Sequence, residues 1–122
     1  MKRLLADRSG VTAVEFGFVA GPLFVLIFGI VKVGQVMWVE NALNYSVQEA
    51  ARCGAVNKSI CATPGQTESY AASAAGAGIT AAAFTASTQS CGSDVLVSYT
   101  MTLSAPFLSY SVPLTAHACF PQ

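Results

Sequence analysis

The chain has 122 residues, a formal net charge of zero, 53% hydrophobic residues and only 10% charged residues. Soluble domains carry about 25% charged residues, so this composition argues against an independent soluble enzyme and against intrinsic disorder. A neutral chain also lacks a basic surface that could neutralise phosphates, which argues against a nucleic-acid partner. The composition points first to a membrane-attached protein with one small domain.

The first candidate element is an apolar run over residues 16–31. With its apolar flanks, this run is long enough to cross a ~30 Å hydrocarbon core. Three basic residues precede it (Lys2, Arg3 and Arg8), so the positive-inside rule places the N-terminus in the cytoplasm and the rest of the chain outside. One alternative is a buried core helix, for which the remaining chain is small. The other is a cleaved signal peptide, but no clean A-x-A site follows the run.

The helical pattern continues beyond the apolar run. An apolar stripe at steps of three and four residues comprises Val36, Val39, Leu43, Val47, Ala50, Ala51 and Gly54. We therefore expect one helix from Val11 to about Val56, roughly 70 Å long, with a kink at Gly21 and Pro22. The remaining residues form too small a domain to bury the whole stripe, so we expect part of it to meet lipid and part to meet other chains.

Residues 59–122 are expected to form a small outer domain. A turn forced by residues 63–65 is followed by a predicted helix from Thr67 to Gly76 and a short helical turn at 80–83. Alternating apolar and polar residues predict strands at 95–104 and 110–120, with a weaker candidate at 84–89.

The predicted architecture is α+β: a long transmembrane and amphipathic helix, a second short helix, and a small antiparallel sheet packed on the upper part of the long helix. Pro113 places the last strand at a sheet edge, or places the paired part of that strand away from Pro113. The apolar connection at residues 105–108 is expected either to enter the core or to form an exposed contact patch.

Four cysteines, Cys53, Cys61, Cys91 and Cys119, show neither C-x-x-C nor zinc-site spacing. Outside the cytoplasm, four cysteines in a small domain indicate two disulfides, for which three pairings are open. We favour Cys53–Cys61, which would lock the end of the long helix to the next loop. The second favoured pair, Cys91–Cys119, would tie the start of one hairpin strand to the end of the other.

The sequence offers no catalytic constellation. His117 is the only histidine, and the carboxylates are too few and too scattered to propose an acid/base pair. No phosphate-binding, dinucleotide-binding or nucleophile-elbow motif is present. We therefore predict no enzyme activity, no cofactor, no metal and no small-molecule substrate. An enzyme built around His117 would need a partner acid or a metal that the sequence does not offer.

The most informative stretch is the junction at Gly10. A charged leader ends at Gly10, an apolar helix begins at Val11, and a single carboxylate, Glu15, follows inside the apolar segment. A carboxylate in a membrane span is unfavourable unless it lies at the interface or is paired. Taken alone, Glu15 would be interpreted as an interfacial residue.

Taken together, this junction resembles the processing site of type IV prepilins, most closely those of the tight-adherence branch. The similarity extends to TadE-like pseudopilins through Val14-Glu15-Phe16, Gly21-Pro22, Gly29-Ile30-Val31, Trp38, Asn41-Ala42-Leu43 and Glu49-Ala50-Ala51-Arg52. The resemblance implies that a prepilin peptidase cuts between Gly10 and Val11. It also implies that Glu15 of one subunit pairs with the new amino terminus of a neighbour.

The resemblance further implies a minor pilin or pseudopilin that supports adhesion or pilus biogenesis. The expected partners are the bacterial inner membrane, the prepilin peptidase, other pilin or pseudopilin subunits and the pilus assembly platform. The protein would cross the membrane once, with its C-terminal domain periplasmic or extracellular, and could enter a pilus.

On this view the chain divides into a leader (1–10), a transmembrane helix half (11–39), an extracytoplasmic helix continuation (40–58) and an outer domain (59–122). The alternative function is an unprocessed, membrane-anchored binding module of the cell envelope.

Overall fold

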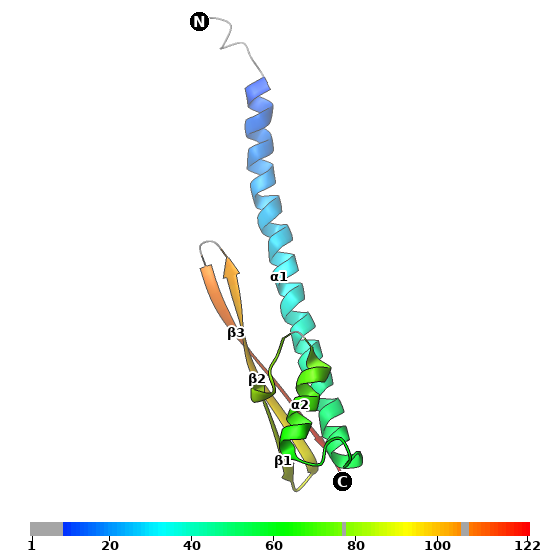
Figure 1. The fold of residues 1–122 in the computed structure, drawn as a ribbon. Coiled ribbons are helices and arrows are strands. Elements are labelled where there is room, and N and C mark those ends of the chain that lie inside the picture. The colour runs from blue at the N-terminus through cyan, green and yellow to red at the C-terminus, as the bar shows by residue number, and fades with distance from the viewer. Residues whose placement is uncertain (1–8, 77, 106–107) are drawn as a thin grey trace, which may run out of the picture. The chain divides into compact units, whose positions relative to one another are not determined.

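The computed structural model describes residues 9–76, 78–105 and 108–122, and the side chains of these residues from Thr12 onward except that of Ala105. The elements in chain order are α1 (Ser9–Val56), α2 (Pro64–Ala75), the 3-10 turn η1 (Ala81–Ala83), β1 (Phe84–Gln89), β2 (Gly92–Ala105) and β3 (Leu108–Phe120) (Figure 1). The predicted α+β class is therefore confirmed. The chain forms two units, residues 1–34 and 35–122, and α1 contributes to both.

Helix α1 runs without interruption through Pro22 to Val56. This agrees with the predicted helix, apart from a start at Ser9 instead of Val11. The predicted kink at Gly21 and Pro22 stays a prediction.

The apolar stripe at the C-terminal end of α1 is covered by the chain's own second unit. Its members Val39, Leu43, Val47, Ala50 and Ala51 are at most 7% exposed, and Val36 packs against the same core. The outer domain thus covers the part of the stripe that begins at Val36, whereas the apolar side chains of residues 12–34 are almost all exposed. That this exposed part meets lipid and other chains stays a prediction.

Helix α2 begins at Pro64, three residues earlier than predicted. Thr63 is its N-cap: the Gln66 backbone N–H donates to Thr63 Oγ1 at 3.3 Å, and the Thr63 backbone N–H donates to Gln66 Oε1 at 3.2 Å. This reciprocal capping box, with Pro64 at the first helical position, satisfies donors that a helix end leaves unpaired. Residues 63–65, which the sequence predicts as a turn, therefore form the start of α2. Gly76 closes the helix, as expected.

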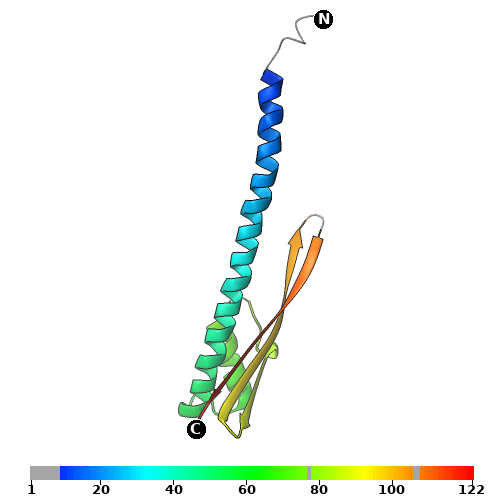
Figure 2. The ribbon, with the colours of Figure 1, turned by 180° about the vertical axis from the view of Figure 1, so that it is seen from behind.

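The three strands form one antiparallel sheet in the order β1-β2-β3 (Figure 2). Strand β1 has the predicted bounds, whereas β2 and β3 begin three and two residues earlier than predicted, at Gly92 and Leu108. The register pairs Val97 with Phe84 on one side and with Ala116 on the other, which aligns the apolar residues on one face. Pro113 lies on the edge strand β3, as predicted.

The core of the second unit lies between the helices and this apolar face of the sheet. Val95 and Val97 are fully buried in it, and Phe84 is 3% exposed. On the outer side of β1, the Ala86 backbone N–H donates to Glu68 Oε1 of α2 at 3.0 Å. Helix α2 thus satisfies a backbone donor of this edge strand. Of the apolar connection, residues 106 and 107 lie outside the described residues, and Leu108 is 70% exposed.

Candidate membrane and assembly region

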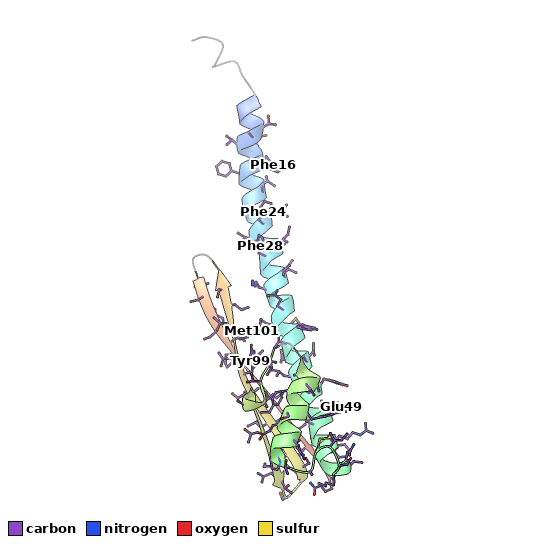
Figure 3. All side chains as sticks on the ribbon, in the orientation of Figure 1. Phe16, Phe24, Phe28, Glu49, Tyr99 and Met101 are labelled. Carbon is purple, nitrogen blue, oxygen red and sulfur yellow. A yellow bond between two sulfur atoms is a disulfide. The ribbon has the colours of Figure 1, made fainter. Side chains whose placement is uncertain are left out.

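The N-terminal part of α1 exposes an almost continuous apolar surface. From Thr12 to Gly34 every side chain except that of Ala20 is exposed, and Phe16, Phe24 and Phe28 project from the helix (Figure 3). Among the described helices, α1 is the one long and apolar enough to cross a membrane. An exposed apolar surface of this extent needs lipid or protein to cover it. A signal sequence has the same composition, so the finding supports a membrane anchor or a signal.

Two ionisable side chains flank the apolar run, Glu15 before it and Lys32 after it, and both are exposed in the single chain. Gly10 and Val11 lie in the first turn of α1. Glu15 follows Val11 by four residues, so the two positions share one face of the helix, one turn apart. The predicted cut between Gly10 and Val11 and the pairing of Glu15 stay predictions.

Two glycines on this helix have a further property that the sequence analysis missed. Gly17 and Gly21 lie four positions apart, with three residues between them, and a Cβ built on either would meet nothing within 4 Å. This small-xxx-small spacing lets two membrane helices approach closely. The four-residue spacing is visible in the sequence and indicates a possible helix contact, but the sequence analysis considers Gly21 only as part of a kink.

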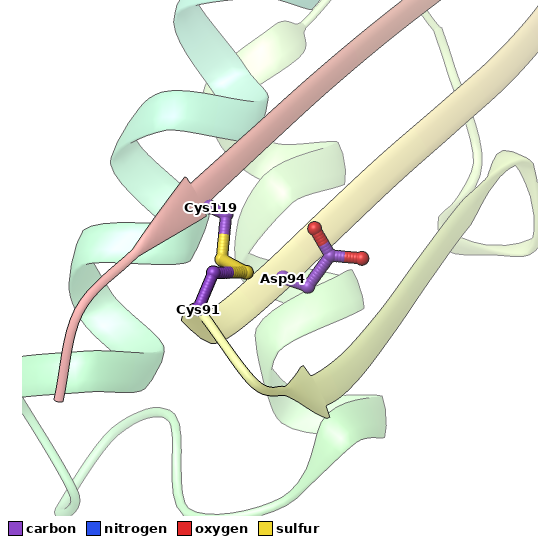
Figure 4. Close-up of side chains that lie close together, drawn as sticks. All are labelled: Cys91, Asp94 and Cys119. Carbon is purple, nitrogen blue, oxygen red and sulfur yellow. A yellow bond between two sulfur atoms is a disulfide. The ribbon is translucent and has the colours of Figure 1, made fainter.

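Both favoured disulfides are present. Cys53–Cys61 joins the last turn of α1 to the following loop, with Cα atoms 5.8 Å apart. Cys91–Cys119 joins the β1–β2 turn to the end of β3, with Cα atoms 6.3 Å apart (Figure 4). The four cysteines therefore form two crosslinks within the second unit, and no free cysteine is found among the described residues.

One cluster of metal-binding residue types surrounds the second disulfide. Potential ligand atoms of Cys91, Asp94 and Cys119 lie within 4.8 Å of one another (Figure 4). The two sulfur atoms are bonded to each other, so neither is a thiolate ligand. The cluster then supplies a single carboxylate, which is too little for a metal site.

His117 has an acid partner, which corrects the expectation that the sequence offers none. Its Nε2 lies in hydrogen-bonding contact with Asp94 Oδ1, and the side chains are 59% and 16% exposed. The register sets His117 opposite Leu96, so Asp94 is its diagonal neighbour on β2. In the described part of the chain, no hydrogen bond joins either side chain to a serine, threonine or cysteine that could act as a nucleophile. The pair therefore links two strands on an exposed face and builds no triad.

Residues 10–52 match the model of the TadE-like protein family. The matched segment contains the junction at Gly10, the exposed apolar part of α1 and the covered stripe as far as Ala51, and it ends before α2 and the sheet. No curated protein and no solved structure is significantly similar to this chain.

Proposed function

We propose that this chain, a TadE-like protein by its N-terminal region, is a minor pilin or pseudopilin of a tight-adherence pilus or a related secretion machine. TadE-like proteins are structural components and not enzymes. The observation that carries the proposal is one continuous helix that has Gly10 and Glu15 at its start, an exposed apolar surface next, and a disulfide-bonded unit at its end.

The membrane topology follows from the charge distribution. Lys2, Arg3 and Arg8 precede the apolar surface, so the leader stays in the cytoplasm. The unit formed by residues 35–122 then lies outside the inner membrane, in the periplasm or extracellular space. Its two disulfides support this side, because disulfides persist in oxidising compartments.

Assembly begins when a prepilin peptidase cuts after Gly10. The cut gives Val11 a free, positively charged amino group. Glu15, the one acid within residues 12–39, then pairs with the amino terminus of a neighbouring subunit. An opposite charge offsets the cost of placing a carboxylate in an apolar helix bundle. Other pilin subunits, brought together at the assembly platform, cover the apolar surface of α1 that the single chain leaves open.

The decisive experiment determines the mature N-terminus of protein extracted from the envelope of the producing cells. Mass spectrometry is expected to find Val11 as the first residue, and Gly10→Leu is expected to retain the leader. Glu15→Ala is expected to be cut normally but to be lost from filaments, because cutting needs the glycine and assembly needs the charge. Glu15→Gln, which keeps the side-chain size and removes the charge, is the matched control and should fail in the same way.

Two results would overturn this function. Protein that still begins at Met1 would indicate the alternative, an unprocessed membrane-anchored binding module of the cell envelope. Normal incorporation of both Glu15 variants into filaments would remove the assembly role of that carboxylate.

A further inference from the structure

We propose that the Cys91–Cys119 disulfide and a bound zinc ion are alternative crosslinks at one site. When this disulfide is reduced, its two sulfur atoms bind Zn²⁺ together with the Asp94 carboxylate and the His117 imidazole; when it is oxidised, they do not. All four residues belong to the unit formed by residues 35–122. The inference goes beyond the proposed function and depends neither on leader processing nor on the membrane span.

Four side chains of metal-binding types gather where the β1–β2 turn meets the end of β3. Potential ligand atoms of Cys91, Asp94 and Cys119 lie within 4.8 Å of one another (Figure 4). His117 joins this group through the contact between its Nε2 and Asp94 Oδ1. Thiolates, imidazoles and carboxylates are the groups that zinc binds in four-coordinate protein sites. The two thiolates favour zinc over magnesium and calcium, which prefer oxygen ligands.

The β-ladder places three of these side chains on one outward face of the sheet. Cys119 is paired directly with Asp94, and His117 lies two residues before Cys119 on β3. Residues two apart on a strand share a face and lie about 7 Å apart, and directly paired residues share that face as well. The intervening residue Ala118 packs against the core, so the three ligand candidates face away from it. Their side chains can therefore turn toward one ion without a change in the ladder.

The backbone holds Cys91 close to the other three ligand candidates. The next residue, Gly92, has a φ of 123°, and a Cβ there would clash with the Phe120 backbone oxygen. Glycine thus lets the β1–β2 turn lie directly on the end of β3. The register continues on both sides of the turn, with Gly92 paired to Gln89 and Ser93 paired to Phe120. None of these contacts involves a sulfur atom, so they hold the turn in place when the S–S bond opens.

The two disulfides differ in their access to a reductant. Cys91 is exposed and Cys119 is half-buried, whereas Cys53 and Cys61 are 8% and 3% exposed. Thiol–disulfide exchange requires that the attacking thiolate reach a sulfur atom. We therefore expect a dithiol reductant to open Cys91–Cys119 first and to leave Cys53–Cys61 closed.

The exchange of the two crosslinks is balanced as follows. Reduction breaks the S–S bond: the two sulfur atoms take up two electrons and two protons, and the dithiol reductant becomes its own disulfide. Zinc then replaces the two thiol protons, which pass to water, and the His117 ring binds as the neutral imidazole. In the reverse direction an oxidising disulfide takes up the two electrons and the S–S bond forms again. Zinc then leaves, because one carboxylate and one imidazole are too few ligands to hold it.

Zinc is expected to replace the mechanical effect of the disulfide. Both crosslinks join the same two cysteines, which are 28 residues apart along the chain. An ion that binds the folded chain and not the unfolded one stabilises the fold. Zinc should therefore raise the thermal midpoint of the reduced chain and leave that of the oxidised chain unchanged.

The test uses the full chain in mild detergent and a phosphine reductant, which does not compete for zinc as a dithiol would. Alkylation and mass spectrometry establish that Cys91 and Cys119 are thiols while Cys53–Cys61 stays closed. Cobalt(II), which is coloured in tetrahedral thiolate sites, is the probe. The reduced chain is expected to give the visible bands of tetrahedral cobalt with a thiolate charge-transfer band, and zinc is expected to remove both. The oxidised chain should give neither.

Ligand variants separate this site from a simple pair of thiols. His117→Ala and Asp94→Asn are each expected to weaken zinc binding by the reduced chain at least about tenfold. Thr115→Ala, at an exposed position on the same face of β3, is the matched control and should bind zinc normally. Near-ultraviolet circular dichroism of each oxidised variant checks the fold. If the reductant opens both disulfides, the same titration is made on Cys53→Ser/Cys61→Ser, which has only the proposed site.

Three results would overturn this inference. One is a reduced chain that gives no tetrahedral cobalt spectrum. The second is equal binding of cobalt by the oxidised and the reduced chain, because the disulfide would then not control the site. The third is an unchanged zinc affinity in both His117→Ala and Asp94→Asn, which would leave two thiols without the other ligands. All three would leave the proposed pilus function standing.

Discussion

Gly54 is a residue of α1 that lies against both α2 and β2. A Cβ built on it would lie 2.4 Å from Ser93 Oγ and 3.6 Å from Thr67 Cγ2. Ser93 and Thr67 are both buried, so the neighbouring side chains have little room to move. In a helix interior an alanine is normally better than a glycine by about 0.5–1 kcal/mol, and here the close approach outweighs that preference.

We therefore predict that Gly54→Ala destabilises the fold by about 1–2 kcal/mol, through overpacking. Thermal unfolding of the full chain in mild detergent would measure this change. Gly65→Ala is the control, since a Cβ at Gly65 in α2 meets nothing within 4 Å, and it should be neutral or slightly stabilising. In a Ser93→Ala background, Gly54→Ala should lose most of its effect. Equal effects of Gly54→Ala with and without Ser93 would show that this contact is not the cause.

Single contacts were the least predictable features at this scale. The hydrogen bond from the Ala86 N–H to Glu68 joins residues 18 apart, and the His117–Asp94 pair joins residues 23 apart. Each depends on how a helix or a strand is placed against another strand, which no local pattern encodes. The disulfide partners were predictable because the topology predicts an oxidising compartment and four cysteines allow only three pairings.

The sheet and α1 are held by two disulfides that close loops of different length. The separation along the chain is 28 residues for Cys91–Cys119 and 8 residues for Cys53–Cys61. In the chain-entropy model, loops of these sizes contribute about 3.6 and about 2.6 kcal/mol respectively to stability.

We predict that the double substitution Cys91→Ser/Cys119→Ser lowers the free energy of unfolding by about 1 kcal/mol more than Cys53→Ser/Cys61→Ser. Denaturant unfolding of the two variants in the same detergent would measure the difference. The same order should appear as a lower denaturant midpoint for the Cys91/Cys119 variant. A larger loss for the short loop would show that the cap at the end of α1, and not loop closure, sets the effect.

Element types were predictable from periodicity, whereas element starts were not. Strands β2 and β3 alternate with period two, so their existence and their buried face followed from the sequence. Their early starts did not. Gly92 lies outside the alternation, and Leu108 continues the alternation of β3 but belongs to the predicted apolar connection at residues 105–108. The start of α2 is harder to predict, because Thr63-Pro64-Gly65 has the composition of a turn, although Thr63 with Gln66 forms a capping box.

At the scale of the whole molecule, the chain contains one unit with a buried core and one without. Residues 35–122 bury the stripe of α1 between the sheet and α2. Residues 12–34 bury almost nothing, and their glycines leave open space around them. Residues 12–34 therefore have an apolar surface that needs lipid or protein to cover it, and under the proposed function lipid and other helices do so.

The last prediction concerns the helix contacts that complete this first unit. Gly17→Leu together with Gly21→Leu should leave the fold of residues 35–122 and membrane insertion unchanged, because a Cβ at either glycine meets nothing within 4 Å. Self-association in the membrane should fall, because two leucines keep the helices from close approach. Crosslinking in membranes and incorporation into filaments would measure both effects.

Gly34→Leu is the matched control for these two substitutions. Its surroundings are equally open, but at about 100° per residue it lies on a different face of α1 from Gly17 and Gly21. It should therefore assemble normally. If all three leucines reduced assembly alike, added bulk or hydrophobicity would explain the loss, and the Gly17–Gly21 face would have no special part in contacts between subunits.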